Sequence, residues 1–368
     1  MSLHLYLKRI LEQRETLSRD EARALLDEVL AGHTDAATVG SAHSLQLAAL
    51  MGAITARGET SAELAGFVDA MRAVALPVPL SEEERGLLVD TCGTGGDLSG
   101  TFNISTAAAL VAAAAESEHS PRLLVAKHGN RAVTSTCGSA DVLEALGIPV
   151  ALAPPDAAEA LRKGHFAFLH APAMHPAMKA VMPVRRALGV RTVFNVLGPL
   201  TNPAGARRQV MGVYSADLVP TVAEAMRLLG VQHVFVVHGF LDNTRSKGMD
   251  ELSISGPSQY IEICGDVSFA TEVRPEQVGL TTAPIDTLRG GDAVHNAAIL
   301  RSIFAGERGP RRDVVLLNSA AVLLAGGHLP VSDWLDALRA AIDLAARTID
   351  SGAVTALIAN LARGRSAL

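Results

Sequence analysis

Glycines, a carboxylate and hydroxyl groups crowd together in the segment DTCGTGGDLSGTFNIST, which runs from Asp90 to Thr106. Glycines let backbone N–H groups approach an anion closely, and the N-terminus of a following helix adds a positive dipole. The run NISTAAALV favours a helix that begins near Ser105, so its amides and hydroxyls would face the same ligand. Asp97 would repel a phosphate unless a ribose hydroxyl or a metal ion lies between them. We therefore expect a sugar phosphate or pyrophosphate with a divalent ion, with a plain tight turn as the alternative.

The glycine segment matches neither of two common nucleotide-binding motifs. It lacks the GK[ST] ending of a Walker A loop and the GxGxxG spacing of a dinucleotide-binding loop. Cys92 lies inside it, but no base partner is visible in the sequence, so we interpret this cysteine as a small packed residue.

A second group of polar residues occupies KHGNRAVTSTCGSAD, from Lys127 to Asp141. Lys127, His128 and Arg131 follow an apolar run, at a place where a phosphate can meet them. The alternative is a solvated basic loop. The acidic chain and the adjacent hydroxyls favour an anion site; these hydroxyls belong to Thr134, Ser135, Thr136 and Ser139.

Two adjacent carboxylates, Asp250 and Glu251, lie in the segment MDELS after another apolar run. Magnesium takes few protein carboxylates and shares the phosphates of a substrate, so this pair suits it. The alternative is a helix N-terminus with acids in its first turn.

The elements that must position these residues change along the chain. Residues 1 to about 80 read as helices only, with capping-box spacing at Ser18/Glu21 and Thr60/Glu63 and with Gly32 and Gly58 as helix stops. From residue 87 onward, short apolar runs alternate with helical patterns, which indicates a mostly parallel sheet covered by helices. The expected strands are 87–90, 122–129, 166–172, 191–196, 208–214 and 233–239, and the expected helices are 104–115, 139–147, 155–164 and 221–230.

The polar segments follow the expected strands. Ligands of such sheets gather at the carboxyl ends of the strands, so we expect these loops at one rim. The five loops are CGTGGD, KHGNR, HAPAMHP, NVLGPLTNP and the region of Asp250.

Composition limits the class of protein. The 368 residues exceed what one hydrophobic core usually serves, so two domains or subdomains are expected. The net charge of -6 argues against nucleic acid as the main partner, and the aromatic content of 4% argues against stacking on bases. Cys92, Cys137 and Cys264 show no CxxC spacing, which fits a reducing cytoplasm. The N-terminus MSLHLYLKRILEQRE carries charges where a signal peptide would be apolar, and we expect no membrane span.

Taken together, the motifs resemble the anthranilate phosphoribosyltransferase family of tryptophan biosynthesis. The resemblance covers nearly the whole chain and rests, in the family's order, on CGTGGD, TFNIST, VAKHGNRA, CGSADVLEALGI, HPAMK, VRRALGVRTVFNVLGPLTNPAG and DELS. It implies an α/β fold like that of pyrimidine nucleoside phosphorylases, with a small all-helical domain and a large domain built on a mostly parallel sheet. The small domain is expected in residues 1–80, joined by helices around 172–190, and the large domain in residues 81–368.

The resemblance also implies an activity. A magnesium-dependent glycosyltransferase would move the phosphoribosyl group of phosphoribosyl pyrophosphate (PRPP) to the amine of anthranilate. Departure of pyrophosphate would be the difficult step, because the aniline amine is already neutral at pH 7. A cytoplasmic homodimer is implied as well, and the apolar face of LQLAALMGAI (Leu45–Ile54) offers a surface for it, unless it packs only within the small domain.

Site residues carry over where the motifs match. Arg185 fits the acceptor chemically because a guanidinium can pair bidentately with a planar carboxylate, whereas Arg186 is expected at the surface. PRPP would be bound by Gly93, Thr94, Gly95, Gly96, Asp97, Thr101, Asn103, Ser105, Thr106, Lys127 and Ser139. Anthranilate would be bound by Gly93, Asn130, His175, Arg185 and Gly198, and Mg2+ by Ser105, Asp250 and Glu251.

Three segments depart from the family pattern. The link FLDNTRSKGMDE before the acid pair is several residues longer than usual, which could displace Asp250. Its Arg245 and Lys247 would reach the leaving group if the link is a lid, and a solvated surface loop is the alternative. ESEHSPR (116–122) and TVGSAHS (38–44) also look extended and are expected to be surface loops.

Two other functions share some of these features. A nucleoside phosphorylase would have the same fold and an anion loop, but it should lack the VRRALG arginine and the GPLTNP segment. A phosphoribosyl-binding module without catalysis would be expected to have lost Asp250 and Glu251. The sequence therefore favours the transferase.

Overall fold

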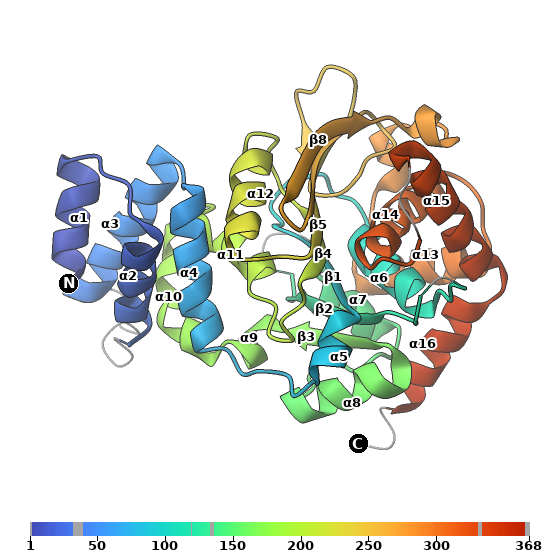
Figure 1. The fold of residues 1–368 in the computed structure, drawn as a ribbon, viewed down its shortest axis with the longest axis horizontal. Coiled ribbons are helices and arrows are strands. Elements are labelled where there is room, and N and C mark those ends of the chain that lie inside the picture. The colour runs from blue at the N-terminus through green and yellow to red at the C-terminus, as the bar shows by residue number, and fades with distance from the viewer. Residues whose placement is uncertain (1, 32–39, 119, 133–135, 330–332, 365–368) are drawn as a thin grey trace.

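The structure is a computed structural model that describes residues 2–31, 40–118, 120–132, 136–329 and 333–364. N-terminal helices stand beside a larger body that is built on one sheet (Figure 1). This arrangement confirms the expected α/β class with a helical N-terminal domain and a mostly parallel sheet in the large domain. None of the helices in these ranges is long and apolar enough to cross a membrane.

Local capping signals define the N-terminal helices α1 (Leu3–Glu12), α2 (Arg19–Ala31), α3 (Ala42–Arg57) and α4 (Ser61–Ala73). Both predicted capping boxes form, at Ser18/Glu21 and at Thr60/Glu63. Gly58 ends α3 with φ = 90°, as predicted, whereas Gly32 lies outside the described residues. Glu63 is fully buried and binds Arg57 at 2.6 Å, so this cap also ties α4 to the end of α3.

The sheet has the strand order β3-β2-β1-β4-β5-β7-β8, and β6 pairs with β5. Strands β1 to β5 run parallel to one another, whereas β6 and β7 pair antiparallel with β5 at one edge, and β8 pairs antiparallel with β7. The strands are β1 (Leu88–Gly93), β2 (Leu124–Gly129), β3 (Phe166–His170), β4 (Arg208–Gly212), β5 (His233–Phe240), β6 (Gly248–Met249), β7 (Ser258–Cys264) and β8 (Val267–Val273).

Helices cover both faces of this sheet (Figure 1). Alternate residues of β5 enter different cores, as a period of two requires: Phe235 joins the core with the C-terminal helices, and Val236 joins the core with the N-terminal ones. The first core takes α6 (Ile104–Ala114), α7 (Ser139–Ala145), η2 (Pro275–Val278), η3 (Ile285–Leu288), α13 (Ala293–Phe304), α14 (Pro310–Ala325), α15 (Trp334–Asp350) and α16 (Ala353–Gly364). The second core takes α1 to α4 with η1 (Pro176–Ala180), α10 (Met182–Leu188), α11 (Val193–Leu200) and α12 (Leu218–Leu228). Of the remaining helices, α8 (Pro154–Gly164) and α9 (Ala171–Met174) contact β3, and α5 (Glu82–Gly86) directly precedes β1.

The prediction of a strand at 191–196 is wrong, because these residues open helix α11. Thr192 caps that helix, and its backbone N–H donates to Asn195 Oδ1 at 3.1 Å. The helix is buried on most sides, with Phe194 and Leu197 in the second core. A short helix that is mostly apolar cannot be told from a buried strand by the pattern of its residues. NVLGPLTNP therefore lies largely within a helix and does not follow a strand.

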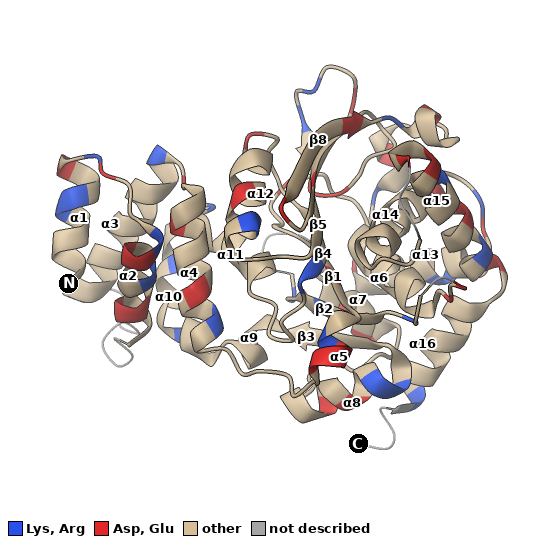
Figure 2. Cartoon of the chain, in the orientation of Figure 1, with Lys and Arg blue, Asp and Glu red and all other residues tan. Residues whose placement is uncertain are grey.

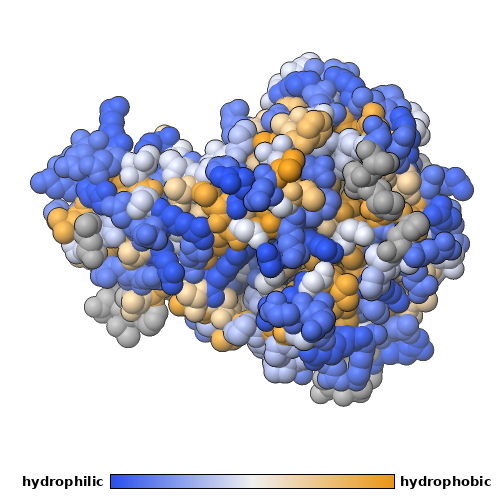
Figure 3. Space-filling model, viewed as in Figure 1, coloured by the Kyte–Doolittle hydropathy of each residue, from blue (hydrophilic) through white to orange (hydrophobic). Residues whose placement is uncertain are grey.

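Neither charge nor hydropathy distinguishes the N-terminal part of the chain from the C-terminal part. Basic and acidic residues are interspersed along the helices of both domains (Figure 2). Hydrophilic residues cover most of the face shown in Figure 3, and hydrophobic residues surface in patches, some of them where the outline narrows between the two lobes.

Candidate active site

Three carboxylates meet beyond the carboxyl ends of the central strands. Single oxygens of Asp97, Asp250 and Glu251 all lie within 4.8 Å of one another. The backbone N–H of Gly95 donates to Asp250 Oδ2 at 2.6 Å, and the backbone N–H of Asp250 donates to Asp97 Oδ2 at 3.3 Å. The long link before Asp250 therefore does not carry this acid away from the glycine loop.

The crowding of these acids fits a divalent cation. Burial and the nearby Asp97 raise the pKa of Asp250 to about 7, and burial with the charge of Asp250 raises the pKa of Glu251 well above its usual value. Glu251 Oε2 is buried and accepts no hydrogen bond within the described ranges. Oxygen ligands of this kind are those that Mg2+ takes. The geometry thus groups Asp97 with the acid pair, whereas the resemblance placed Asp97 among the PRPP-binding residues and not among the metal ligands.

Glycines at the ends of three adjacent strands make room for the acid pair. A Cβ at Gly93 of β1 would lie 2.1 Å from Asp250 Oδ2, and one at Gly212 of β4 would lie 1.5 Å from the Asp250 carbonyl oxygen. A Cβ at Gly239 of β5 would lie 2.4 Å from the Glu251 carbonyl oxygen. The segment that carries both acids therefore rests directly on the strand ends.

The glycine loop turns sharply after β1. Gly95 and Gly96 have φ values of 68° and 75°, a region that residues with a Cβ enter at a cost. The backbone N–H of Thr94 donates to the Gly212 carbonyl at 3.0 Å, and Arg191 Nη1 donates to the Gly96 carbonyl at 3.2 Å. Further along, Thr101 forms a β-bridge with Arg289. The loop is thus fixed at several points along the expected PRPP site.

Lys127 is a buried cation between the glycine segment and β2. Its ammonium donates to the Thr91 carbonyl at 2.6 Å and to Ser105 Oγ at 3.3 Å. Burial lowers the pKa of Lys127 below its usual value, and the nearby carboxylates of Asp90, Asp250 and Glu251 offset only part of this effect. Cys92 is itself buried and packed, as expected.

The expected PRPP residues of α6 have different surroundings. Asn103 Nδ2 donates to the Cys137 carbonyl at 3.2 Å, and Asn296 Nδ2 donates to Asn103 Oδ1 at 2.9 Å. Thr106 is fully buried, whereas Ser105 is half-buried beside Lys127. Only Asn103 and Ser105 of this group therefore offer partly open side chains.

Two buried histidines mark the expected acceptor side. The rings of His128 and His175 are 5.2 Å apart, and His128 Nδ1 lies 3.1 Å from the Gly198 carbonyl oxygen of α11. Burial lowers the pKa of His128 to about 3 and that of His175 to about 4, so both rings are neutral at pH 7. The sequence predicted that His175 and Gly198 bind the acceptor and that His128 meets a phosphate beside Lys127; the structure places the His128 ring between His175 and Gly198.

Arg185 reaches toward α11 from α10. Its Nη2 donates to Asn195 Oδ1 at 3.5 Å, and its guanidinium lies 5.6 Å from the centre of the Phe194 ring. Burial lowers the pKa of Arg185, and no carboxylate of the described ranges forms an ion pair with it. Arg186 is exposed. A half-buried guanidinium with a weak neutral partner is suited to receive an anion.

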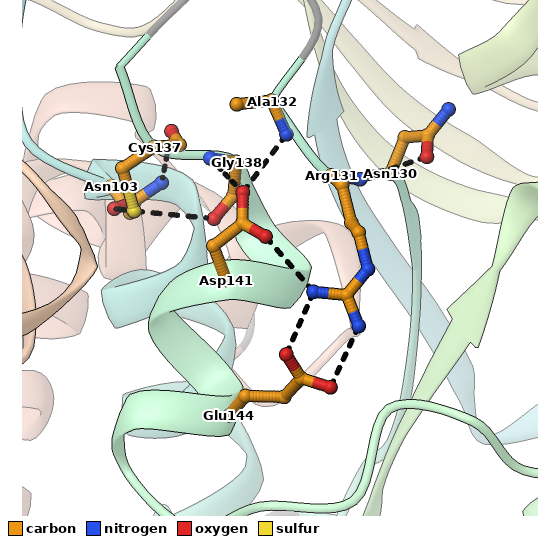
Figure 4. A network of polar contacts seen from close by, with 8 residues as sticks. All are labelled: Asn103, Asn130, Arg131, Ala132, Cys137, Gly138, Asp141 and Glu144. Atoms are coloured by element: carbon orange, nitrogen blue, oxygen red, sulfur yellow. Dashed lines mark hydrogen bonds and ion pairs between the residues drawn. The ribbon is translucent and has the colours of Figure 1, made fainter.

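Arg131 does not serve as an open cation. Its guanidinium pairs with Asp141 at 3.0 Å and with Glu144 at 2.7 Å (Figure 4). Asn130 and Ser139 flank the same segment, whereas Thr134 and Ser135 lie outside the described residues. The structure thus gathers Gly93, Gly95, Asp97, Asp250 and Glu251 in one cluster, and it brings His128, His175 and Gly198 together in another.

Comparisons with known proteins agree with this geometry. The helical bundle domain of a glycosyl transferase family matches residues 5–75, and the a/b domain of a glycosyl transferase family matches residues 85–355. The anthranilate phosphoribosyltransferase of Chloroflexus aggregans is 47% identical over 341 residues, 92% of each chain, and that of Symbiobacterium thermophilum is 49% identical over 313 residues, 85% of this chain and 86% of its own.

Solved structures give the same result. The crystal structure of the enzyme from Thermus thermophilus has a TM-score of 0.83 at 39% identity, covering 97% of this chain and 98% of that chain. The enzyme from Saccharomyces cerevisiae in complex with PRPP and Mg has a TM-score of 0.85 at 27% identity, covering 100% and 98%. The resemblance predicted from the motifs is confirmed: this chain belongs to the anthranilate phosphoribosyltransferase family.

Proposed function

We propose that this chain transfers the phosphoribosyl group of PRPP to the amine of anthranilate, with release of pyrophosphate. The observation that carries this proposal is the meeting of the glycine loop with Asp97, Asp250 and Glu251 at the strand ends. The related yeast enzyme has been solved with PRPP and Mg, and also with 4-fluoroanthranilate at a TM-score of 0.83 and 26% identity.

The donor lies along the glycine loop and the N-terminus of α6. Backbone N–H groups of the loop and the Ser105 hydroxyl bind the pyrophosphate, and the Lys127 ammonium stabilises the charge that grows as pyrophosphate leaves. Ser105, Asp250 and Glu251, with Asp97 beside them, would hold Mg2+, which neutralises phosphate charge when bound.

The acceptor lies between α10 and α11, where Arg185 pairs with its carboxylate. The amine nitrogen forms a bond with the anomeric carbon as the bond to the pyrophosphate oxygen breaks, and the nitrogen then gives its proton to water or to the released pyrophosphate. His128 and His175 are neutral and shape the pocket without supplying a charge. Holding the amine in line with the departing group provides much of the rate enhancement. No strong base is required, because the aniline amine is already neutral at pH 7.

We also propose the domain boundaries and the assembly. Residues 1–80 with the helices around 172–190 form the small domain, since α10 packs against α3 and Val184 shares the core of α1 to α4. Residues 81–368 form the large domain. The exposed Leu5, Leu11 and Leu45 on α1 and α3 support a homodimer. We place the protein in the cytoplasm because its three cysteines show no CxxC spacing.

A direct assay tests the reaction. Purified protein is mixed with anthranilate, PRPP and Mg2+, and N-(5-phosphoribosyl)anthranilate is identified by mass spectrometry. Formation of this product together with one equivalent of pyrophosphate is expected. Absence of product, with phosphorolysis of a pyrimidine nucleoside in its place, would identify a phosphorylase.

A further inference from the structure

We propose that Asp141 is a positioning residue for both substrates: it joins the two ends of the segment that connects Asn130 to Ser139. The inference rests on the proposed function, because it takes Asn130 to contact the acceptor and Ser139 to contact the donor. Asp141 itself lies on α7 and acts through the backbone of that segment (Figure 4).

One oxygen of Asp141 holds both ends of the segment. Asp141 Oδ2 accepts hydrogen bonds from the backbone N–H of Ala132 and from that of Gly138, each at 2.9 Å. The second of these bonds also caps the start of α7, and Ala140 N–H donates to the Asn130 carbonyl at 3.3 Å. The backbone that follows Asn130 is therefore bound to the backbone that precedes Ser139.

The two ends touch so closely that a side chain would separate them. A Cβ at Gly138 would lie 2.3 Å from the Ala132 nitrogen and 2.8 Å from the Asn130 carbonyl oxygen. Only glycine allows this approach. The carboxylate of Asp141 then satisfies two N–H groups that converge from opposite directions, and a donor that is left without a partner away from water is destabilising.

Arg131 acts as a partner of this carboxylate and not as a phosphate ligand. Its Nη1 donates to Asp141 Oδ1 at 3.0 Å, and its two terminal nitrogens donate to the two oxygens of Glu144 at 2.7 Å each. Although burial raises the pKa of Asp141, the N–H groups of Ala132 and Gly138 and the Arg131 guanidinium lower it overall. Asp141 thus stays ionised and retains its capacity to accept all three bonds.

The same segment is also bound to the donor side. Asn103 at the start of α6 donates from Nδ2 to the Cys137 carbonyl at 3.2 Å, next to Gly138. Loss of the Asp141 carboxylate would free Ala132 and Gly138 while the acids of the metal cluster stay in place, since those lie beyond β1 and β6. The expected consequence is weaker binding of donor and acceptor together, with little change in the chemical step.

A pair of substitutions separates this role from simple stabilisation of α7. In Asp141→Asn the amide oxygen can still accept from Ala132 and Gly138, and Arg131 keeps Glu144. In Asp141→Ala both bonds are lost. We expect the alanine variant to raise the KM of PRPP and of anthranilate by about tenfold each, near the loss of one to two hydrogen bonds, with kcat within about threefold. The asparagine variant should stay within about threefold of the parent in all constants.

Glu144→Gln is the matched control, because it removes the negative charge that faces Arg131 and leaves both backbone bonds of Asp141. Its KM values should equal those of the parent. Hydrogen exchange provides a readout that needs no substrate: the amides of Ala132 and Gly138 should exchange faster in Asp141→Ala and normally in Asp141→Asn. Gly138→Ala also pushes the two ends apart. It should raise both KM values in the same way, and it takes the place of Asp141→Ala if that variant does not fold.

The outcomes are distinct. Parental KM values in folded Asp141→Ala, or equal damage in Asp141→Asn and Asp141→Ala, would overturn the inference. Higher KM values in Asp141→Ala and Gly138→Ala, with rescue in Asp141→Asn, would support it. An inactive parent protein would refute the proposed function, and the exchange rates of Ala132 and Gly138 would then still decide whether Asp141 joins the segment ends.

Discussion

Arg185 is a half-buried guanidinium with an amide oxygen as its neighbour, so a bound carboxylate would gain a charge-assisted pair. Replacing it by alanine leaves that carboxylate unpaired in a partly desolvated site, at a cost of about 2–5 kcal/mol. We expect Arg185→Ala to raise the KM of anthranilate far more than the KM of PRPP. Steady-state kinetics with each substrate varied in turn would measure this. Arg186→Ala serves as the control from the exposed side of the same helix, and equal effects on both substrates would place Arg185 outside the acceptor site.

The acid pair leads to a prediction about metal. Asp250→Asn with Glu251→Gln removes the charges that would hold Mg2+, so turnover should be lost at low magnesium. The melting temperature should not fall, because neutral side chains relieve the repulsion that raises the pKa of both acids. Activity is measured across a magnesium titration, beside thermal unfolding of both proteins. An unchanged magnesium dependence would contradict the assignment.

At the residue scale, the chemical role of a residue was easier to predict from the sequence than the residues that it contacts. The glycine motif and the acid pair were both identified, but their contact joins residues such as Gly95 and Asp250 that lie 155 positions apart. The same is true of Arg131, whose charge suggested a phosphate until the fold placed Asp141 and Glu144 against it. The contact partners of a side chain depend on the three-dimensional fold, and a single sequence does not reveal them.

Among the elements, the long link from Phe240 to Gly248 now has contacts of its own. Arg245 pairs with Glu272 of β8 and lies 5.3 Å from the centre of the Phe240 ring. These contacts favour a surface role over that of a lid. We expect Arg245→Ala with Lys247→Ala to leave the affinity for PRPP within about twofold, as is usual for exposed pairs. Calorimetric titration with PRPP at low ionic strength measures this affinity. If the link were a lid, the double variant would lose about 1–2 kcal/mol of binding free energy.

Elements with a clear period were predicted well, and those without one were not. The strands around β1, β2, β3, β4 and β5 were all expected, because short apolar runs alternate there with amphipathic helices. Helix α11 was mistaken for a strand because it is buried on most sides. The hairpin of β7 and β8 was not anticipated: Val267 and Phe269 of β8 are exposed, so the apolar residues of this strand do not mark a buried face.

For the whole molecule, the neutral histidines predict a loss of stability in acid. The pKa of His175 is about 4 in the folded protein against an ordinary value of 6.5. The unfolded chain therefore binds more protons as pH falls through 6.5, and stability declines until about pH 4. Between pH 7 and pH 5 this histidine alone should remove about 2 kcal/mol.

The measurement compares urea unfolding of the parent and of His175→Asn at both pH values. Asp250, with its raised pKa, acts in the opposite direction, because it gains a proton in the folded state as pH falls. That effect is common to both proteins and cancels in the difference between them. A difference that is the same at pH 7 and pH 5 would show that His175 titrates normally.

The assembly can be tested at the same scale. A homodimer should give a light-scattering mass of about twice 38.3 kDa at micromolar concentration. The exposed Leu5 and Leu45 are the residues expected to be covered, whereas Leu47 and Leu50 of the same helix α3 are already buried within the chain. Leu45→Glu should shift the mass toward the monomer. A single species of 38.3 kDa in the parent would argue against the dimer.

The glycines under the acid pair also constrain how this chain can diverge. Gly93, Gly212 and Gly239 come from three separate strands, yet all of them touch the one segment that carries Asp250 and Glu251. Recombination that imported this segment from a distant relative would succeed only if the recipient already had all three glycines. The acid pair and the strand ends are thus sterically coupled, although they are scattered over more than half the length of the large domain.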